Sequence, residues 1–405
     1  MKDIQVINYC EVCGSNSIQE VLDLGEHPLC DDLIPVGSDK INTEYPIKVG
    51  LCNTCLTSHQ MYQVDKVKLF PKNYHYRARF TKDVLDGMIS LKNSVFEKEG
   101  SLKNKIVLDI GCNDGCLLDI FKKDGAFTIG VEPTNASKDA EKKGHKIFNN
   151  FFDKKTAILI KDSFAPIDLI TFTNVFAHIE NLKELLENLK IIISETTSLI
   201  IENHYLGSIL EKNQFDTFYH EHPRTYSLNS FIKVAENLDM TITKYEFPSR
   251  YGGNIRVFLE NLKHNNNLNL DNQILDKENL FKDQFLEMKN FLKDWKIKKR
   301  AEIIDYVEKY GPMPAKAFPG RAAILIKFLE LNEKHISAIY ERTGSQKIGN
   351  YVPSTRIPIL DESIFFEKYI SSKVILNLAW HISHEIKNYL IKKGFKGLVI
   401  NILDE

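Results

Sequence analysis

The sequence predicts an α/β protein built on a parallel sheet, with a small cysteine-rich module before it and a second α/β domain after it. Residues 106–121 run from an apolar, β-branched segment through a glycine loop into a helical pattern, and residues 129–131 form a second short apolar segment. Residues 168–175 and 198–203 supply two further buried strands. Strand, loop, helix and strand in this order are typical of a doubly wound nucleotide-binding sheet.

The loop at residues 109–115 indicates the kind of ligand. Asp109, Gly111 and Gly115 follow the pattern Asp-x-Gly-x-x-x-Gly. A dinucleotide-binding loop would need further glycines at the positions of Asn113 and Cys116, so that fingerprint is absent. The pattern instead resembles the first motif of class I S-adenosylmethionine-dependent methyltransferases.

Two acidic residues strengthen this interpretation. Glu132 ends the second segment, where a carboxylate accepts hydrogen bonds from both ribose hydroxyls of an adenosine ligand. Asp114 lies in the loop and would suit a cationic sulfonium ligand better than a pyrophosphate. The alternative is an ordinary β–α turn in an unrelated α/β domain, because glycines alone are a weak signal.

The amino-acid composition limits the classes of protein to which the chain can belong. The chain has 405 residues, 43% of them hydrophobic, which is enough for two or three cores. The net charge is -1 and the basic residues are scattered, which argues against nucleic acid as a partner. No apolar run reaches the roughly 20 residues of a membrane span, and no signal peptide is apparent. We therefore expect a soluble, cytoplasmic monomer without membrane contact.

Four of the seven cysteines form two pairs, Cys10-x-x-Cys13 and Cys52-x-x-Cys55. Each pair forms a turn that presents two thiolates, and two such turns complete a tetrahedral Zn²⁺ site. Four sulfur ligands leave no open coordination position, so the zinc is expected to be structural. Cys30 lies outside the pairs and is expected to be a small buried hydrophobe.

Polar residues follow the carboxyl ends of two predicted strands, which is where ligands bind in parallel sheets. Asn174, Phe176 and His178 follow one strand, and residues 202–204 end the next. Residues 215–222 then place two histidines, two acids and a tyrosine within eight positions. If this segment is extended, Tyr219 and Glu221 face away from His222, whereas a turn would bring Glu221 and His222 together. The alternative is that these residues form a second metal site or a plain polar loop.

Ser227 is expected to cap a helix over residues 228–238, and residues 251–258 are expected to form a glycine turn into a strand.

In order along the whole chain, these features resemble the sugar-nucleotide C-methyltransferases that build branched deoxysugars. The resemblance implies a zinc-binding module over residues 1–72, a methyltransferase domain over 73–264 and a Rossmann-like domain over 265–405. It implies that a keto-sugar site is formed by Tyr219, Glu221, His222, His178 and Tyr76. It also implies that S-adenosylmethionine is bound by Asp109, Gly111, Asn113, Asp114, Gly115, Glu132, Pro133, Asn174 and Phe176.

The last third of the chain predicts one long helix and a second sheet. Residues 272–310 carry an apolar stripe that includes Leu275, Leu280, Phe281 and Phe285, as one helix face would. Four apolar segments follow at residues 336–340, 357–360, 374–378 and 398–402. Residues 311–321 depart from the family pattern, because prolines and Phe318 occupy a place where the family has a glycine-rich loop.

The expected reaction is methylation of the carbon next to the ketone of a nucleotide-linked keto-deoxysugar. The ketone acidifies that carbon, and His222, held by Glu221, removes the proton to give an enolate. Tyr219 and His178 are expected to donate hydrogen bonds to the enolate oxygen. Methyl transfer then requires only alignment, with neither a redox cofactor nor a catalytic metal. The alternatives are O- or N-methylation of the sugar, or a non-catalytic protein that binds sugar nucleotides.

Overall fold

The computed structural model describes residues 4–70, 77–80, 82–261 and 272–404. The chain divides into two compact units. The first comprises Met1–Val21, Val49–Glu211 and Glu221–Lys282, and the second comprises Leu22–Lys48, Lys212–His220 and Asp283–Glu405. Each unit has its own sheet.

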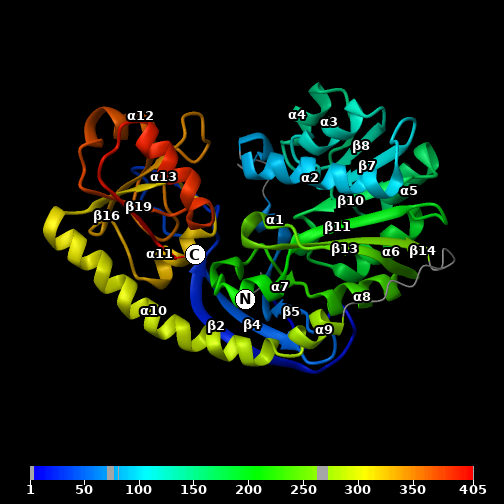
Figure 1. The fold of residues 1–405 in the computed structure, drawn as a ribbon, viewed down its shortest axis with the longest axis horizontal. Coiled ribbons are helices and arrows are strands. Elements are labelled where there is room, and N and C mark those ends of the chain that lie inside the picture. Colours follow the sequence, from blue (N-terminus) through cyan, green and yellow to red (C-terminus); the bar gives the residue numbers. More distant parts are fainter. Residues whose placement is uncertain (1–3, 71–76, 81, 262–271, 405) are drawn as a thin grey trace. The chain divides into compact units, whose positions relative to one another are not determined.

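A seven-stranded sheet forms the centre of the first unit (Figure 1). Its strands are β7 (Ile106–Ile110), β8 (Phe127–Val131), β9 (Lys146–Phe148), β10 (Leu169–Thr173), β11 (Ser198–His204), β13 (Met240–Glu246) and β14 (Asn254–Asn261). They lie in the order β13-β14-β11-β10-β7-β8-β9. The strands from β11 to β9 are parallel, whereas β14 enters antiparallel between β11 and β13. The predicted strands at residues 106, 129, 168 and 198 are therefore confirmed.

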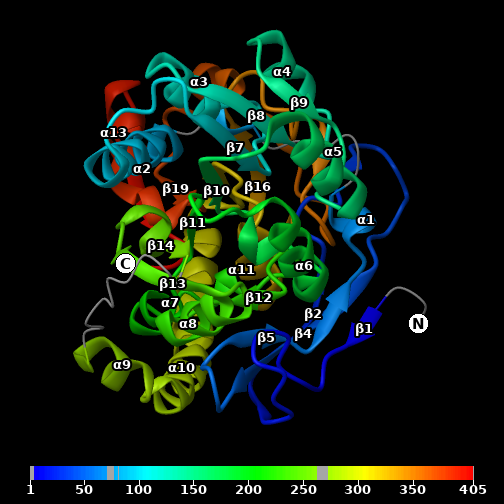
Figure 2. The same cartoon turned by 90° about the vertical axis from the view of Figure 1, so that its right-hand side faces the viewer.

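Helices cover both faces of this sheet because each buries one apolar stripe (Figure 2). α2 (Lys82–Glu99) and α3 (Cys116–Lys123) pack against one face through Val84, Leu91 and Phe121. α5 (Lys154–Phe164), α6 (Leu182–Ile192) and α8 (Leu228–Asn237) pack against the other. Short helices α4 (Ser137–Lys142) and α7 (Leu206–Glu211) follow β8 and β11. Ser227 caps α8 by accepting from the Ser230 backbone N–H at 2.9 Å, as the sequence predicts.

The cysteine-rich module belongs to the same unit. Its elements are β1 (Ile4–Val6), β5 (Ser58–Gln60), β6 (Tyr62–Val64), α1 (Lys66–Leu69) and parts of β2 (Ile18–Pro28) and β4 (Glu44–Cys52). β5 pairs with β4 on one side and with β12 (Arg224–Thr225) on the other. Cys10, Cys52 and Cys55 share a hydrophobic core with α8, so the module packs directly on the large sheet's core.

The second unit contains five parallel strands in the order β18-β16-β15-β19-β20. They are β15 (Met313–Lys316), β16 (Ile336–Glu341), β18 (Ile359–Asp361), β19 (Val374–Asn377) and β20 (Leu398–Asn401). α10 (Phe281–Tyr310), α11 (Ala322–Phe328), α12 (Glu362–Ile364) and α13 (Ser383–Lys392) accompany them, and β3 (Ile34–Pro35) pairs with β17 (Asn350–Tyr351). This confirms a second parallel α/β sheet.

The structure corrects two expectations for the last third of the chain. The single helix over residues 272–310 is wrong: α9 (Asn272–Glu278) ends before α10 begins, and Leu280 in the break is 53% exposed. The Glu278 side chain is buried and accepts hydrogen bonds from the backbone of Leu228 and Asn229 at the start of α8, at 2.6 and 3.0 Å. Residues 311–321 also contain the central strand β15, which the sequence did not predict because Pro314 donates no ladder hydrogen bond; the register shifts at Met313 and Pro314.

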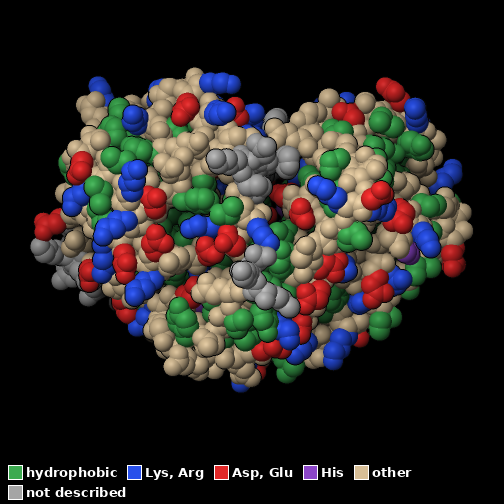
Figure 3. All heavy atoms as spheres, turned by 180° about the vertical axis from the view of Figure 1, so that it is seen from behind, with side chains coloured by type: hydrophobic (Ala, Val, Ile, Leu, Met, Phe, Trp, Pro, Cys, Tyr) green, Lys and Arg blue, Asp and Glu red, His purple; other side chains and the backbone are tan. Residues whose placement is uncertain are grey.

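Charge is mixed on the face drawn in Figure 3, where Lys and Arg are interspersed with Asp and Glu. Among the helices of the described residues, none is long and apolar enough to cross a membrane.

Candidate active site

The glycine loop after β7 turns sharply through three residues with positive φ. Gly111, Asn113 and Gly115 have φ of 76°, 49° and 76°. A Cβ on Gly111 would lie 2.5 Å from Val175 Cγ1, so glycine is required there both by conformation and by space. The chain thereby enters α3 directly after the loop, leaving backbone at the carboxyl end of β7 for a ligand.

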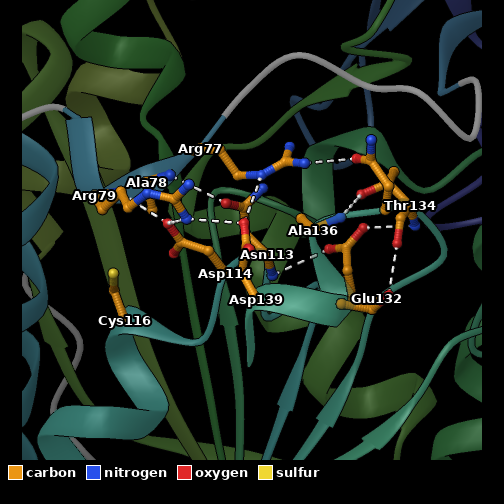
Figure 4. Close-up of polar contacts among 12 residues, drawn as sticks. Arg77, Ala78, Arg79, Asn113, Asp114, Cys116, Glu132, Thr134, Ala136 and Asp139 are labelled. Atoms are coloured by element: carbon orange, nitrogen blue, oxygen red, sulfur yellow. Dashed lines mark hydrogen bonds and ion pairs between the residues drawn. The ribbon is translucent and has the colours of Figure 1, made fainter. Parts of the chain in front are cut away.

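Glu132 holds this loop from the end of β8 (Figure 4). Its carboxylate accepts hydrogen bonds from the backbone N–H groups of Asn113 at 3.0 Å and Thr134 at 2.9 Å. A carboxylate has about four acceptor positions, so two remain for ligand hydroxyls. Pro133 follows directly and is half-buried. The predicted cofactor residues Asn113, Glu132 and Pro133 are thus brought together.

The two aspartates of the loop are buried. Asp109 accepts a hydrogen bond from Thr171 Oγ1 at 2.7 Å, and burial raises its pKa to about 7. Asp114 Oδ2 accepts from the backbone N–H of Arg79 at 3.2 Å and lies 3.4 Å from Arg79 Nη1. Part of the loop's negative charge is therefore already balanced by an arginine, which the sequence did not indicate.

A short arginine segment fastens onto the same loop (Figure 4). Ala78 N–H donates to Asn113 Oδ1 at 3.0 Å. Arg77 Nε and Arg79 Nη1 contact Asp139 Oδ2 at 3.2 and 2.8 Å. Arg77 Nη2 also donates to Asn135 Oδ1 at 2.6 Å. The segment before α2 is thereby joined both to the loop and to α4.

At the carboxyl end of β10, polar atoms are left without partners. Asn174 has a φ of 54°, and its Nδ2, like Thr173 Oγ1, has no hydrogen-bond partner among the described residues. Buried polar atoms without protein partners suit a ligand that supplies them. Phe176 is fully buried against Phe172 and Tyr226, so only its backbone is available for a cofactor contact. These unpartnered atoms, together with the Glu132 carboxylate, fit S-adenosylmethionine.

Three histidine rings gather beside this edge of the sheet. The ring centroids of His178 and His222 are 4.7 Å apart, and those of His222 and His204 are 5.2 Å apart. Tyr251 continues the series, with its ring 5.5 Å from His204. The structure therefore brings His178 and His222, both predicted for the sugar site, together with His204, which the sequence places at the same edge of the sheet. His204 ends β11 and lies between His222 and Tyr251.

His178 has a defined tautomer. Its Nδ1 lies 2.7 Å from the carbonyl oxygen of Glu221, so Nδ1 carries the proton and donates it. Burial lowers the pKa of His178 to about 4, and the ring is neutral near pH 7. A neutral imidazole has one N–H, and the Glu221 carbonyl uses it. A hydrogen bond from His178 to an enolate would need the second nitrogen to be protonated, which burial disfavours.

The segment at residues 215–222, where the sequence places two histidines, two acids and a tyrosine, forms a turn. Phe215–Thr217 form a 3₁₀ helix, and a turn follows at residues 220–221, so the extended alternative is wrong. Glu221 and His222 are buried in the first unit, whereas Tyr219 belongs to the second unit, as does His220, whose Nε2 lies 3.1 Å from the Tyr45 carbonyl. Tyr76 lies outside the described residues.

A buried ion-pair network that the sequence did not reveal supports this edge. Glu202 Oε2 accepts from Arg256 Nε at 2.7 Å, and its Oε1 lies 3.2 Å from Arg250 Nη1. Arg256 Nη1 also contacts Glu246 Oε2 at 2.7 Å. Such groups are costly to bury unless they are paired, and here each charge has a partner. The network joins β11, β13 and β14 next to His204.

The four paired cysteines converge as predicted. Their sulfur atoms all lie within 4.8 Å of one another, with Cys10 and Cys55 at 3.4 Å and Cys13 and Cys52 at 3.6 Å. Tetrahedral zinc with Zn–S bonds of about 2.3 Å needs sulfurs about 3.8 Å apart, so the cluster fits Zn²⁺. His59 Nε2 lies 3.3 Å from Cys10 Sγ, a neighbour that spacing alone did not predict.

Three family models match successive parts of the chain. Residues 10–70 match the model described as "Putative zinc binding domain", residues 80–245 match "Methyltransferase domain", and residues 249–397 match "C-methyltransferase C-terminal domain". Together with the sheet order, the loop and the sulfur cluster, they define an S-adenosylmethionine-binding methyltransferase with a zinc-binding module.

Two curated methyltransferases are similar to parts of this chain. C-methyltransferase NovU from Streptomyces niveus is 27% identical over 261 residues, which are 64% of this chain and 62% of NovU. A ubiquinone biosynthesis O-methyltransferase from Coxiella burnetii (strain Dugway 5J108-111) is 26% identical over 145 residues, 31% of this chain and 62% of that protein. The chain therefore combines regions similar to these three domains and is a distant homologue of NovU, of whose length it matches 62%.

Solved structures give weaker matches. Magnesium protoporphyrin IX methyltransferase from Synechocystis PCC 6803 with bound S-adenosylmethionine is 12% identical, with 44% of this chain and 80% of that chain covered and a TM-score of 0.34. The PH0226 protein from Pyrococcus horikoshii OT3 is 13% identical, with coverages of 48% and 97% and a TM-score of 0.36. Scores this low carry no argument about this chain.

Proposed function

We propose that this chain methylates the carbon next to the ketone of a nucleotide-linked keto-deoxysugar, with His222 as the base. The observation that carries the proposal is the histidine cluster in a domain matched by a methyltransferase model. His222 lies between the rings of His178 and His204, 4.7 and 5.2 Å away. The match to a C-methyltransferase C-terminal domain favours carbon as the acceptor.

The base must be neutral before it accepts a proton. A neutral imidazole accepts a proton through its unprotonated ring nitrogen. The neighbouring His178 is neutral, because burial lowers its pKa to about 4, and so it adds no positive charge against protonation of His222. We therefore assign the proton transfer to His222 and give His178 the task of holding the Glu221 carbonyl through Nδ1–H.

The step conserves atoms and charge. The C–H bond next to the ketone breaks, its proton moves to the His222 ring, and its electron pair forms the enolate. Tyr219 is the proposed donor to the enolate oxygen, and Tyr76 and Glu221 complete the proposed sugar site. S-adenosylmethionine, when bound, supplies an electrophilic methyl group and leaves as a thioether.

The proposed cofactor site is formed by Asp109, Gly111, Asp114, Gly115, Asn174 and the contact between Asn113 and Glu132. The division into residues 1–72, 73–264 and 265–405 remains part of this proposal.

An exchange experiment tests the base. A nucleotide-linked 4-keto-6-deoxysugar is incubated in heavy water with the protein and S-adenosylhomocysteine, which cannot donate a methyl group. Wild-type protein should introduce deuterium at the carbon next to the ketone, and His222→Ala should lose about a hundred- to ten-thousandfold of that rate. His335→Gln is the matched control, because His335 Nδ1 contacts Asn332 in a turn before β16.

The methyl acceptor is tested separately. With a deuteromethyl donor, NMR of the product should show a new carbon–carbon bond. A product with the methyl group on oxygen or nitrogen would show that carbon is not the acceptor.

In the exchange experiment, deuterium uptake by His222→Ala at the wild-type rate would show that His222 is not the base.

A further inference from the structure

The zinc-binding module and the histidine cluster are connected by a largely buried carboxylate. Glu11 lies inside the first Cys-x-x-Cys turn, between Cys10 and Cys13. Its Oε2 accepts a hydrogen bond from Gln63 Nε2 at 2.7 Å and lies 3.7 Å from His59 Nδ1. His59 in turn places Nε2 3.3 Å from Cys10 Sγ. The carboxylate is thus fixed to the cysteine turn by its own backbone and through His59.

The same carboxylate oxygen pairs with the guanidinium of Arg224, whose side chain is completely buried. Arg224 donates to the carbonyl oxygens of Ile179 and Glu180, the two residues that follow His178. Its Nε donates to Tyr226 Oη at 3.1 Å. One planar side chain therefore holds the backbone immediately after His178, and its fork of five N–H donors is what permits these bonds.

Arg224 also follows His222 by two residues, on β12. There it pairs in register with His59 of β5, and the Pro223 carbonyl oxygen accepts from the Gln60 N–H at 2.8 Å. The cysteine module therefore fixes the segment just after His222 through the β5–β12 ladder. It fixes the segment just after His178 through Arg224. Both constraints lie within the first unit.

We propose that Glu11 and Arg224 are positioning residues, which hold both His178 and His222 at a fixed distance from the zinc-binding turn. This rests on the proposed function only in treating these histidines as part of the reaction site. Among the described residues, the polar contacts of the pair run to His59, Gln63, Tyr226 and the carbonyl oxygens of Ile179 and Glu180, so the pair holds two backbone segments in register. Displacing a catalytic group by about 1 Å costs about a hundredfold in rate, so a small loss of register is measurable.

Glu11→Gln tests the proposal because it keeps the side chain's size and removes its charge. Glu99→Gln is the matched control: Glu99 is also a largely buried carboxylate, which accepts from Ser198 Oγ at 2.7 Å and pairs with Lys105. Ser198 begins β11 and His204 ends it, so Glu99 lies at the opposite end of that strand. Zinc per chain, affinity for S-adenosylhomocysteine and the ring resonances of labelled histidines are compared in the two variants.

Glu11→Gln should retain one zinc per chain and the wild-type cofactor affinity, while the resonances of His178 and His222 shift and turnover of the keto-sugar probe falls about a hundredfold. Glu99→Gln should change none of these. The second variant, Arg224→Lys, keeps the charge but loses the fork and should shift the same two histidines.

Unmoved resonances of both histidines in Glu11→Gln and Arg224→Lys would overturn the proposal. A shift that appears only in proportion to lost zinc would also overturn it, because the metal alone would then account for the effect. The resonances are read without substrate. If wild-type protein fails to methylate the probe, the proposed function fails while the positioning role is still decided.

Discussion

Replacing Glu132 by Gln should weaken binding of S-adenosylmethionine while leaving the chemistry of bound substrate almost unchanged. Glu132 is 5% exposed and accepts two backbone N–H groups, those of Asn113 and Thr134. A glutamine has one acceptor oxygen and turns an N–H₂ group toward the other donor. The variant therefore leaves one loop N–H without its partner and removes the charged acceptor available for ribose hydroxyls.

The magnitude follows from these contacts. A hydrogen bond to a charged group contributes about 1.5–3 kcal/mol, so loss of the ribose contact corresponds to about ten- to a hundredfold in affinity. The unpaired loop N–H should lower the free energy of unfolding of the cofactor-free protein by about 1–3 kcal/mol. Titration calorimetry with S-adenosylhomocysteine measures the first effect and urea unfolding the second.

Asp119→Asn is the matched control for Glu132→Gln. Asp119 lies on α3, directly after the same loop, and pairs with Lys143 at 2.9 Å and His145 at 3.0 Å. It should lose stability with little change in affinity. An unchanged dissociation constant for Glu132→Gln, or an equal loss in Asp119→Asn, would refute the placement of the ribose at Glu132.

Two further predictions concern metal and pH. Purified protein should contain one zinc per chain, and Cys52→Ser should lose both the zinc and thermal stability, because three sulfurs no longer close the site; metal analysis showing unchanged zinc in Cys52→Ser would contradict this. Acid should also destabilise the fold, because burial lowers the pKa of His27, His178 and His220 to about 4. Between pH 4 and about 6.5 the unfolded chain therefore binds more protons than the folded chain, and the free energy of unfolding falls as the pH falls through that range. Each histidine contributes about 1.6 kcal/mol of loss between pH 6.5 and 5. Asp109, whose pKa is raised to about 7, opposes this with a gain of about 1.8 kcal/mol, so these four groups together give a net loss of about 3 kcal/mol. Urea unfolding at the two pH values measures it, and equal stability would contradict the burial of these rings.

Local patterns were sufficient for four parallel strands of the large sheet and for the sulfur cluster. Apolar segments at residues 106, 129, 168 and 198 became β7, β8, β10 and β11, because a strand buried on both faces is apolar along its length. Each Cys-x-x-Cys turn positions its two sulfurs locally, so only the meeting of two turns had to be inferred. The glycines of the loop and the Ser227 cap are equally local signals.

Other features could not be predicted from local patterns. The extended and turn alternatives for residues 219–222 were equally compatible with the sequence, and packing selected the turn. β15 lies at the centre of its sheet although Pro314 disfavours a strand locally, because flanking strands β16 and β19 supply its pairing. The helix break at Leu280 similarly depends on where Glu278 is buried.

The amino-acid sequence alone thus determined the class of fold, the two Cys-x-x-Cys turns and the glycine loop after β7, each of which depends on residues a few positions apart. Only the tertiary structure decided which charges and rings meet. Glu11 and Arg224 are separated by 213 positions, and His178 meets the Glu221 carbonyl across 43. Neither contact leaves a periodic or spaced signal in the sequence, because a buried pair depends on which elements pack together and not on their local conformation.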